Sequence, residues 1–208
     1  MEIRSKKQLE VVLSRLKGFK DAKVSAEQYI TPSSIAAEVL WDLYIKGLLA
    51  NKVSVDLGSG TGILGIGCLL LGCKKVYFVE SEGSAMEICG QNLEKYQSEF
   101  KGRYELVLGD ALDFKTKADI AIMNPPFGTK NRHIDRNFLK SAFSMANMTC
   151  SFHKTTTIDY IIEYARKNNR KLVERLDFRY LLGNTMKHHR KAKQYIGVSC
   201  VIFVISRR

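Results

Sequence analysis

With 208 residues, the chain is long enough for one domain with a proper hydrophobic core and leaves little for a second domain. Its apolar fraction of 45% and charged fraction of 26% are those of an ordinary globular protein, and no apolar run approaches the ~18 residues of a membrane span. The formal net charge of +12 favours a polyanionic partner, nucleic acid more than anionic lipid, although basicity alone is a weak indicator.

Two further features of the whole chain bear on its location and chemistry. No charged-then-apolar leader opens the sequence, so we expect a cytoplasmic protein. The cysteines are odd in number and lack C-x-x-C or Cys/His ligand spacing, which predicts structural thiols and no metal site. They are Cys68, Cys73, Cys89, Cys150 and Cys200.

The first 48 residues predict two helices. From Ser5 to Leu16, apolar residues recur on one helical face and Lys and Arg occupy the other, which favours a helix packed on the domain over an RNA-binding arm. Thr31 as N-cap and Pro32 at the first helical position predict the start of a second helix. Its expected buried stripe comprises Ile35, Ala36, Val39, Leu40 and Leu43.

A glycine-rich turn follows the first predicted strand. Val53 to Leu57 is typical of a short buried strand, and it runs into Asp56-Leu57-Gly58-Ser59-Gly60-Thr61-Gly62 before a predicted helix from Ile63 to Leu71. Glycines at alternate positions let the backbone approach a ligand closely and turn sharply into that helix.

The second predicted strand, Val76 to Val79, delivers an acid to the same region. Glu80 lies 22 positions after Gly58, close to the ~20 expected of an acidic side chain that holds a ribose diol. The glycines depart from the dinucleotide pattern G-x-G-x-x-G, because Ile63 stands where its last glycine would be. A dinucleotide seats its pyrophosphate on the helix N-terminus, whereas S-adenosylmethionine has no phosphate, so the pattern favours the latter.

A third strand carries a second acid to this edge of a doubly wound sheet. A predicted helix from Ser84 to Tyr96 and a strand from Tyr104 to Leu108 lead to Gly109-Asp110. Asp110 could accept from an adenine amino group while Glu80 holds the ribose. The alternative for either acid is that it caps the helix that follows it.

The most distinctive stretch is Asn124-Pro125-Pro126-Phe127, directly after the apolar run from Ala118 to Met123. The two prolines lack N–H donors, fix their own φ and push the preceding residue out of the α region. They predict a stiff corner at the carboxyl end of a strand, where open α/β sheets place their ligands. The Asn124 amide, the Pro125 carbonyl and the Phe127 ring offer two acceptors and a flat apolar face, which suit a flat ring with an exocyclic amine. The alternative is a rigid loop with Phe127 in the core.

The rest of the chain again alternates helices and strands. We predict helices over 138–148 and 158–167 and strands over 150–154, 172–180 and 195–205. A polar basic loop, Gly128 to His133, follows the proline corner. Between the last two strands lies Lys187-His188-His189-Arg190-Lys191-Ala192-Lys193, which we interpret as contacting phosphate in preference to a merely solvated loop.

Together these motifs resemble the Rossmann-like, S-adenosylmethionine-dependent amino-methyltransferases with an Asn/Asp-Pro-Pro-aromatic motif, and among them the small methyltransferase-like RNA adenine-N6 methylases of ribosomal RNA. The resemblance covers nearly the whole chain. It rests on Glu27-Gln28-Tyr29-x-Thr31-Pro32, Asp56-Leu57-Gly58-x-Gly60-x-Gly62, Asn124-Pro125-Pro126-Phe127-Gly128-Thr129-Lys130 and His153-Lys154. It implies an α/β, Rossmann-like class I methyltransferase fold with a mostly parallel seven-stranded sheet and helices on both faces. Residues 1–208 would form a single domain, with 1–48 as helical cap and cofactor lid and 49–208 as core.

The resemblance also implies roles for individual residues. Asn124, Pro125, Pro126 and Phe127 would form the catalytic corner. The expected cofactor-binding set is Gln28, Tyr29, Thr31, Asp56, Gly58, Gly60, Thr61, Ile63, Glu80, Asp110 and Ala111. The expected RNA-binding set is Lys130, Arg132, Lys154, Lys187, His188, Arg190, Lys191 and Lys193. Glu80 replaces the more usual Asp of the family at the ribose, which should preserve the contact with a longer arm.

Family members in higher organisms work with a small zinc-binding activator protein that pairs along the third strand. Here that strand would be Tyr104 to Leu108. Its apolar alternation fits such a partner and a buried face equally well, so both interpretations stay open.

The predicted reaction is methyl transfer from S-adenosylmethionine to the N6 amine of an adenosine in structured RNA, with positioning supplying most of the acceleration. One rival is a methylase of glutamine amides in release factors, which more usually carries Tyr at the corner and has its own N-terminal substrate domain. A second rival is a DNA adenine methylase with a target-recognition domain, and a third is a non-catalytic RNA-binding subunit. The chain has room for neither extra domain, and the complete set of motifs argues against the third.

Overall fold

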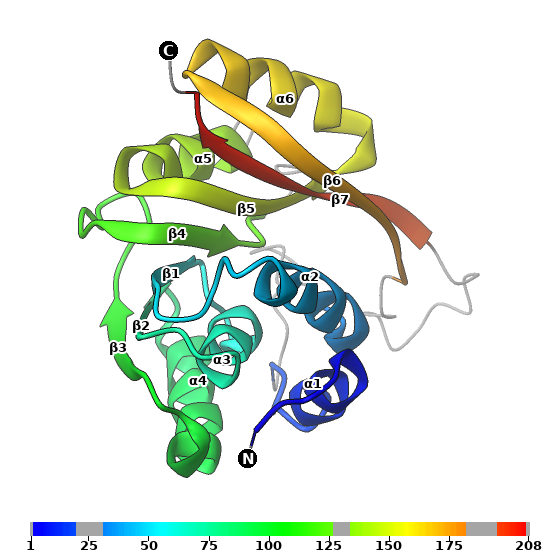
Figure 1. Cartoon of the computed structure of the whole chain (residues 1–208). Helices are drawn as coiled ribbons and strands as arrows, with labels where there is room; N and C mark the ends of the chain where they lie inside the picture. Colours follow the sequence, from blue (N-terminus) through cyan, green and yellow to red (C-terminus); the bar gives the residue numbers. More distant parts are fainter. Residues whose placement is uncertain (1, 20–30, 127–133, 182–194, 207–208) are drawn as a thin grey trace, which may run out of the picture.

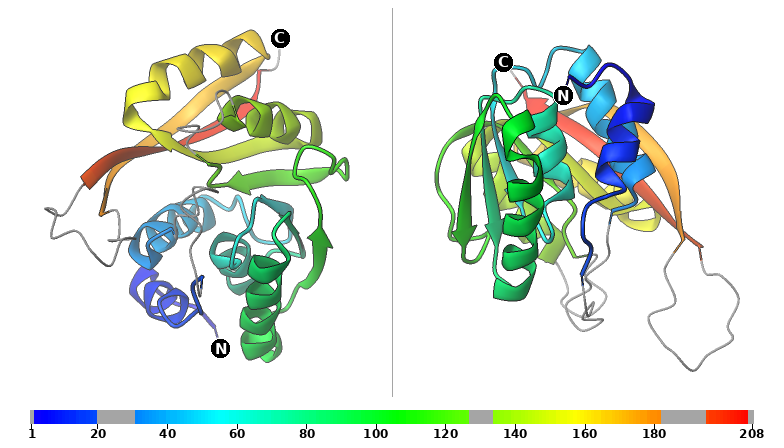
Figure 2. Two further views of the ribbon diagram at one scale, coloured as in Figure 1. Left: turned by 180° about the vertical axis from the view of Figure 1, so that it is seen from behind. Right: turned by 90° about the horizontal axis from the view of Figure 1, so that it is seen from below.

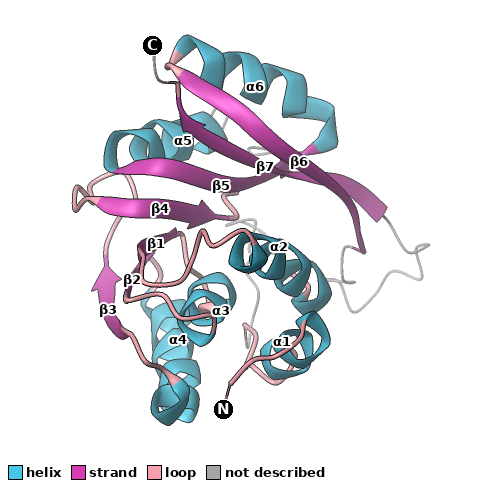
Figure 3. Ribbon diagram, viewed as in Figure 1, coloured by secondary structure: helices cyan, strands magenta, loops and turns pink. Residues whose placement is uncertain are grey.

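A seven-stranded sheet forms the centre of the computed structural model, which describes residues 2–19, 31–126, 134–181 and 195–206. The strand order is β3-β2-β1-β4-β5-β7-β6, and only β7 runs antiparallel to its neighbours (Figure 3). This confirms the predicted mostly parallel sheet. The strands are β1 Val53–Leu57, β2 Lys75–Glu80, β3 Arg103–Leu108, β4 Ala118–Met123, β5 Ala146–Lys154, β6 Arg170–Leu181 and β7 Tyr195–Ile205.

Helices cover both faces of the sheet, as Figure 1 shows. One apolar cluster joins the sheet to α1–α4, and a second joins its other face to α5 and α6. The helices are α1 Lys6–Leu13, α2 Ser33–Ile45, α3 Ile63–Leu70, α4 Gly83–Tyr96, α5 Ile134–Met145 and α6 Ile158–Lys167, with the 3-10 turns η2 Gln97–Glu99 and η3 Thr155–Thr157. None of these described helices is both long and apolar enough to cross a lipid bilayer.

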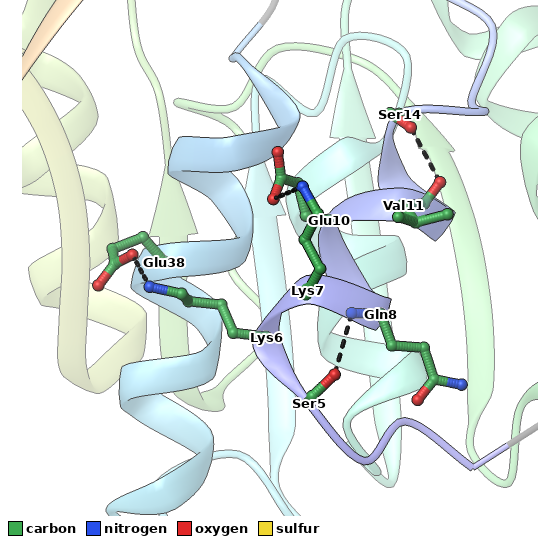
Figure 4. Close-up of polar contacts among 8 residues, drawn as sticks. All are labelled: Ser5, Lys6, Lys7, Gln8, Glu10, Val11, Ser14 and Glu38. Carbon is green, nitrogen blue, oxygen red and sulfur yellow. Dashed lines mark hydrogen bonds and ion pairs between the residues drawn. The ribbon is translucent and has the colours of Figure 1, made fainter.

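The two N-terminal helices share the core of the sheet. Leu9, Val12 and Leu13 of α1 are buried in the same cluster as α2 and α3. Ser5 caps α1 by accepting from the Gln8 N–H, and Lys6 forms an ion pair with Glu38 of α2 (Figure 4). The predicted packing of the first helix on the domain is therefore confirmed.

Two predicted helix boundaries are wrong. Helix α2 begins at Ser33, with Pro32 in an extended conformation as its N-cap, because the Thr31 hydroxyl bonds to another segment and does not cap the helix. Helix α5 spans Ile134–Met145, whereas we predicted 138–148. Residues 146–148 belong to β5, where Met148 pairs alongside Ile120 of β4. Strand pairing overrides the helical periodicity there.

A buried arginine closes the junction at which α5 passes directly into β5. The Arg170 guanidinium donates to the carbonyl groups of Ala146 (3.0 Å), Asn147 (3.1 Å) and Phe143, and it stacks on the Phe143 ring. Arg170 is only 7% exposed. The Phe143 carbonyl lies in the last turn of α5, where a cation complements the partial negative charge and supplies a donor that the helix itself lacks, and the other two carbonyl groups belong to the start of β5.

We expect Arg170→Met to lower the free energy of unfolding by roughly 2–4 kcal/mol, because it leaves buried carbonyl groups without donors. Urea titration followed by circular dichroism measures this change. The matched control is Arg166→Met, whose exposed guanidinium on α6 pairs with Glu163 at the surface and should contribute under about 1 kcal/mol. Equal losses in the two variants would contradict the capping role of Arg170.

Candidate functional site

The carboxyl ends of β1, β2 and β4 meet at one edge of the sheet. Register pairs Leu57 with Val79 and Asp56 with Ile122, so these three strands end nearly level. The sheet reverses its direction of growth between β1 and β4, and such a reversal opens a crevice at the carboxyl ends of the strands. The predicted glycine turn and the proline corner lie on the two sides of this crevice.

The glycine turn is held to the second strand by backbone and side-chain hydrogen bonds. The N–H groups of Gly58 and Ser59 both donate to the Val79 carbonyl, at 2.8 and 3.0 Å. Glu80 bridges two segments, because one carboxylate oxygen accepts from the Gly60 N–H and the other from the Glu82 N–H, at 2.8 and 2.9 Å. Glu82 is the N-cap of α4. Glu80 therefore contacts both the glycine turn, as predicted, and the start of α4.

Asp56 is buried beneath this turn. Its Oδ2 accepts from the Gly65 N–H in the first turn of α3, at 2.8 Å. The pKa of Asp56 is raised to about 7. Burial is the main cause, the Gly65 hydrogen bond lowers the pKa, and the nearby Glu80 carboxylate adds to the rise. The Asp56 carboxyl thus ties the strand to the helix on the inner side of the turn.

Asp110 and Ala111, which come after β3 and Gly109, have different surroundings. Asp110 is exposed, and its Oδ1 accepts from the Leu112 N–H at 2.8 Å, so it closes a local turn. Ala111 is buried, and its carbonyl accepts from the Ser141 hydroxyl of α5. Asp110 caps no helix among the described residues, and that alternative does not apply to it.

The proline corner is anchored through Asn124. Its Nδ2 donates to the Thr31 Oγ1, at 2.9 Å, across 93 positions of the chain. The Asn124 Oδ1 is buried and has no hydrogen-bond partner among the described residues. Thr31 is 4% exposed and Pro125 is buried, which keeps this corner rigid. An unsatisfied buried acceptor costs free energy unless a ligand supplies its donor.

A neutral histidine lies on the strand beside the corner. Ser151 pairs with Met123 at the end of β4, and its hydroxyl is 2.7 Å from the Nε2 of His153. Burial lowers the His153 pKa to about 3, so the ring is uncharged at neutral pH. Lys154, predicted to bind RNA, is the half-buried last residue of β5.

Several predicted site residues lie outside the described residues. They are Gln28, Tyr29, Phe127, Lys130, Arg132, Lys187, His188, Arg190, Lys191 and Lys193. Of the others, the structure brings Asp56, Gly58, Gly60, Thr61, Ile63 and Glu80 together around the turn, and Thr31 with Asn124 at the corner.

Sequence reasoning missed three features near the site. Asn92 is a polar residue on the buried face of α4 and contacts the turn, and Phe19 lies against Gly60. A polar residue at an apolar position of a helix was the available signal for Asn92. Arg175 and Arg179 are exposed on one face of β6, which runs with β7 beyond the end of β5 (Figure 2, right). They lie four positions apart on the same face, with Asp177 between them and paired with Arg175 at 2.9 Å, and this spacing was visible in the sequence.

Strand β3, at one lateral edge of the sheet, is exposed. Strand β3 pairs only with β2 among the described strands, and its Leu106 and Leu108 are 39% and 64% exposed. Of the two interpretations left open for this strand, the structure excludes a fully buried face. An apolar edge strand with free backbone groups is a site for pairing with another chain.

Comparison with known proteins gives consistent matches over most of the chain. The methyltransferase small domain family matches residues 35–151. The zebrafish (Danio rerio) rRNA N(6)-adenosine-methyltransferase METTL5 is 34% identical, over 95% of this chain and 97% of the relative. Its Caenorhabditis elegans counterpart metl-5 is 32% identical over 92% and 94%. The crystal structure of PH1948 from Pyrococcus horikoshii, named as a candidate RNA methyltransferase, has a TM-score of 0.87 at 37% identity over 97% of this chain and 98% of that one.

The buried Asp56 carboxyl predicts a pH-dependent stability. Its pKa rises from 3.8 in an unfolded chain to about 7 in the folded protein, so its contribution to stability is complete below pH 3.8 and is lost as the pH rises through 7. Asp56→Asn removes the ionisable group, so the variant should not lose this stability as the pH rises. We expect the variant to gain stability over the wild type between pH 4 and 8, on the order of 4 kcal/mol, in denaturant titrations at each pH.

The exposed substitution Asp113→Asn is the matched control and should follow the wild-type profile. A difference between Asp56→Asn and wild type that stays constant from pH 4 to 8 would contradict this assignment.

Proposed function

This chain belongs to the methyltransferase small domain family and is an S-adenosylmethionine-dependent enzyme, and we propose that it methylates the N6 amine of an adenosine in ribosomal RNA. The rRNA N6-adenosine methyltransferases of zebrafish and Caenorhabditis elegans, similar over nearly their whole length, support this substrate. The observation that carries the proposal is the Asn124 amide, whose nitrogen is anchored to Thr31 while its buried oxygen has no donor among the residues that the structure describes.

An adenine amino group supplies what this corner lacks. The N6 nitrogen carries two protons, one for the Asn124 Oδ1 and one for the carbonyl of Pro125. Because its lone pair is delocalised into the ring, the amine is a poor nucleophile. Two acceptors favour a pyramidal nitrogen and aim the lone pair at the methyl donor, so positioning supplies most of the rate.

The ring of Phe127 is the proposed stacking partner of the adenine. The base must leave its own stack to reach the corner, and stacking on an aromatic side chain offsets part of that cost. Such stacking is worth ~1–3 kcal/mol per base. No strong general base is required before the transfer, since the neutral amine would form its bond to the methyl group as the bond from that methyl group to the sulfonium breaks. The methylated nitrogen would then release one proton to water.

The residues around the glycine turn fit the proposed cofactor. Gly58, Gly60 and Gly62 all have positive φ and present backbone without side chains, and Glu80 already has a fixed orientation for a ribose diol. When bound, S-adenosylmethionine supplies an electrophilic methyl group on a sulfonium. We assign the adenine side of the pocket to Asp110 and Ala111 at the end of β3, and the lining of the turn to Asp56, Thr61 and Ile63.

The remaining proposed contacts complete the site. Residues 1–48, including Gln28, Tyr29 and Thr31, form a cap and lid of the single domain over the cofactor. RNA phosphates contact the basic residues predicted from the sequence, together with Arg179 on the exposed face of β6, where the neighbouring Arg175 is ion-paired with Asp177. A ribosomal RNA substrate supports placement of the protein in the cytoplasm.

Strand β3 is the proposed pairing site of a small zinc-binding activator protein. Its position at the sheet edge and the exposure of Leu106 and Leu108 support this role. A strand added there would satisfy the outward backbone groups of β3 and cover its leucines.

The Thr31–Asn124 hydrogen bond predicts a graded set of activities. Asn124→Ala should lower kcat at least 100-fold, because it removes the Oδ1 that accepts a hydrogen bond from the N6 amine of adenine. Thr31→Val removes only the anchor and should lower kcat about tenfold, whereas Thr31→Ser keeps the hydroxyl and should stay near wild type. Single-turnover methylation of ribosomal RNA with labelled S-adenosylmethionine measures all three. Equal rates for Thr31→Val and Thr31→Ser would refute the anchoring role.

The same assay separates the candidate substrates. Labelled S-adenosylmethionine is offered with ribosomal RNA, duplex DNA or a release factor. Label recovered as N6-methyladenosine from the RNA supports the proposal, and label found only in DNA or in protein overturns it in favour of the corresponding rival.

Substitutions on β3 test the activator. Leu108→Glu should weaken binding of the activator from the same organism at least tenfold, in size-exclusion and titration experiments, with little change in thermal stability because the residue is 64% exposed. The control is Val173→Glu, at a residue that is 51% exposed on β6 at the opposite edge of the sheet. Undiminished binding by Leu108→Glu would exclude β3 as the pairing site.

A further inference from the structure

The segment after α1 is fastened to the glycine turn by one buried amide. Asn92 of α4 is 1% exposed, and its Oδ1 accepts from the Lys17 N–H at 2.8 Å. Its Nδ2 donates both to the Lys17 carbonyl and to the Thr61 carbonyl, each at 2.9 Å. One side chain therefore holds the main chain of the N-terminal segment against the main chain of the turn.

Two neighbouring contacts strengthen the same attachment. The Lys95 ammonium donates to the Arg15 carbonyl at 3.0 Å, and the Lys17 ammonium donates to the Gln91 Oε1 at 2.9 Å. All three attachment points lie on the last two turns of α4. The position of the chain at Lys17 is thus fixed before it reaches Phe19.

Phe19 points the tip of its ring at Gly60. A β-carbon placed on Gly60 would lie 3.0 Å from the Phe19 Cζ and 3.8 and 3.9 Å from its two Cε atoms. Gly60 is also the residue whose N–H donates to Glu80. Gly60 therefore has a second reason to be glycine, besides its φ of +54°, in the close approach of this ring.

Phe19 is not an ordinary core residue. It is only half-buried, and neither of the two apolar clusters formed by the described residues includes it. A half-exposed aromatic ring held by a buried hydrogen-bond network, against the turn that faces the crevice, is placed for a ligand. An aromatic ring also suits a ligand that carries a sulfonium cation beside an apolar chain.

We propose that Phe19 forms a wall of the S-adenosylmethionine site and that Asn92 is the positioning residue that holds Phe19 there. This inference rests on the proposed function, and it adds a cofactor contact from an N-terminal segment that carries no recognised motif. Phe19 touches the cofactor, while Asn92 acts through the backbone of Lys17 and Thr61.

Measurements of cofactor binding in the absence of RNA test the proposed contact between Phe19 and the cofactor. Isothermal titration of S-adenosylmethionine and S-adenosylhomocysteine into Phe19→Ala should show a Kd raised about tenfold, with Phe19→Leu between this variant and wild type. The matched control is Tyr160→Ala, whose ring is 47% exposed on α6. A Kd of Phe19→Ala within twofold of that control overturns the inference, while failure of the wild type itself to bind the cofactor overturns the proposed function as well.

A double-mutant cycle tests the positioning role. Asn92→Ala should weaken cofactor binding in the wild type and speed deuterium exchange of the Lys17 amide, and it should weaken binding by a smaller factor in the Phe19→Ala background, where only its bond to Thr61 still bears on the site. Where Asn92→Ala does not fold, Asn92→Asp keeps the shape and removes both donated hydrogen bonds. Additive losses in the two backgrounds would show that Asn92 does not act through Phe19, and would overturn this part.

Discussion

The turn from Gly58 to Gly62 is the constraint on which the arrangement of the site depends. Its glycines adopt positive φ, a conformation that other residues reach only with strain, and hydrogen bonds from several elements hold it in place. The Val79 carbonyl and the Glu80 carboxylate bind it from β2, and the Asn92 amide binds it from α4. A turn fixed in this way can present bare backbone to a ligand without reorganising when the ligand arrives.

The proline corner, on the other side of the crevice, is fixed in a different way from the glycine turn. Two prolines make the backbone stiff, and the Thr31 hydroxyl fixes the rotation of the Asn124 amide. The Asn124 oxygen has no hydrogen-bond donor within the described part of the chain, and a buried acceptor in that state carries a desolvation cost. The proposed substrate would offset this cost by supplying the donor.

Burial also controls the charges close to the site. The carboxyl of Asp56 has a raised pKa and the ring of His153 a lowered one, and in both cases loss of hydration favours the neutral form. Glu80 lies nearer the crevice, where its two carboxylate oxygens accept from the N–H groups of Gly60 and Glu82. These hydrogen bonds fix the orientation of the acid proposed to hold the ribose.

The sequence by itself determined the order of strands and helices along the chain, the glycine turn, the acid that ends β2, the acid that follows β3, and the proline corner, because each depends on residues close together in the chain. Strands β1, β4 and β7 and helix α6 begin and end where the periodicity predicts. Only the tertiary structure decided that α5 ends at Met145, because pairing with β4 and the Arg170 cap act from distant segments. The same holds for Thr31, which anchors Asn124 and caps no helix, and for Phe19, whose place against Gly60 depends on a buried amide 73 positions further along the chain. Such contacts leave no local pattern in the sequence, since each joins segments that only the folded sheet brings together.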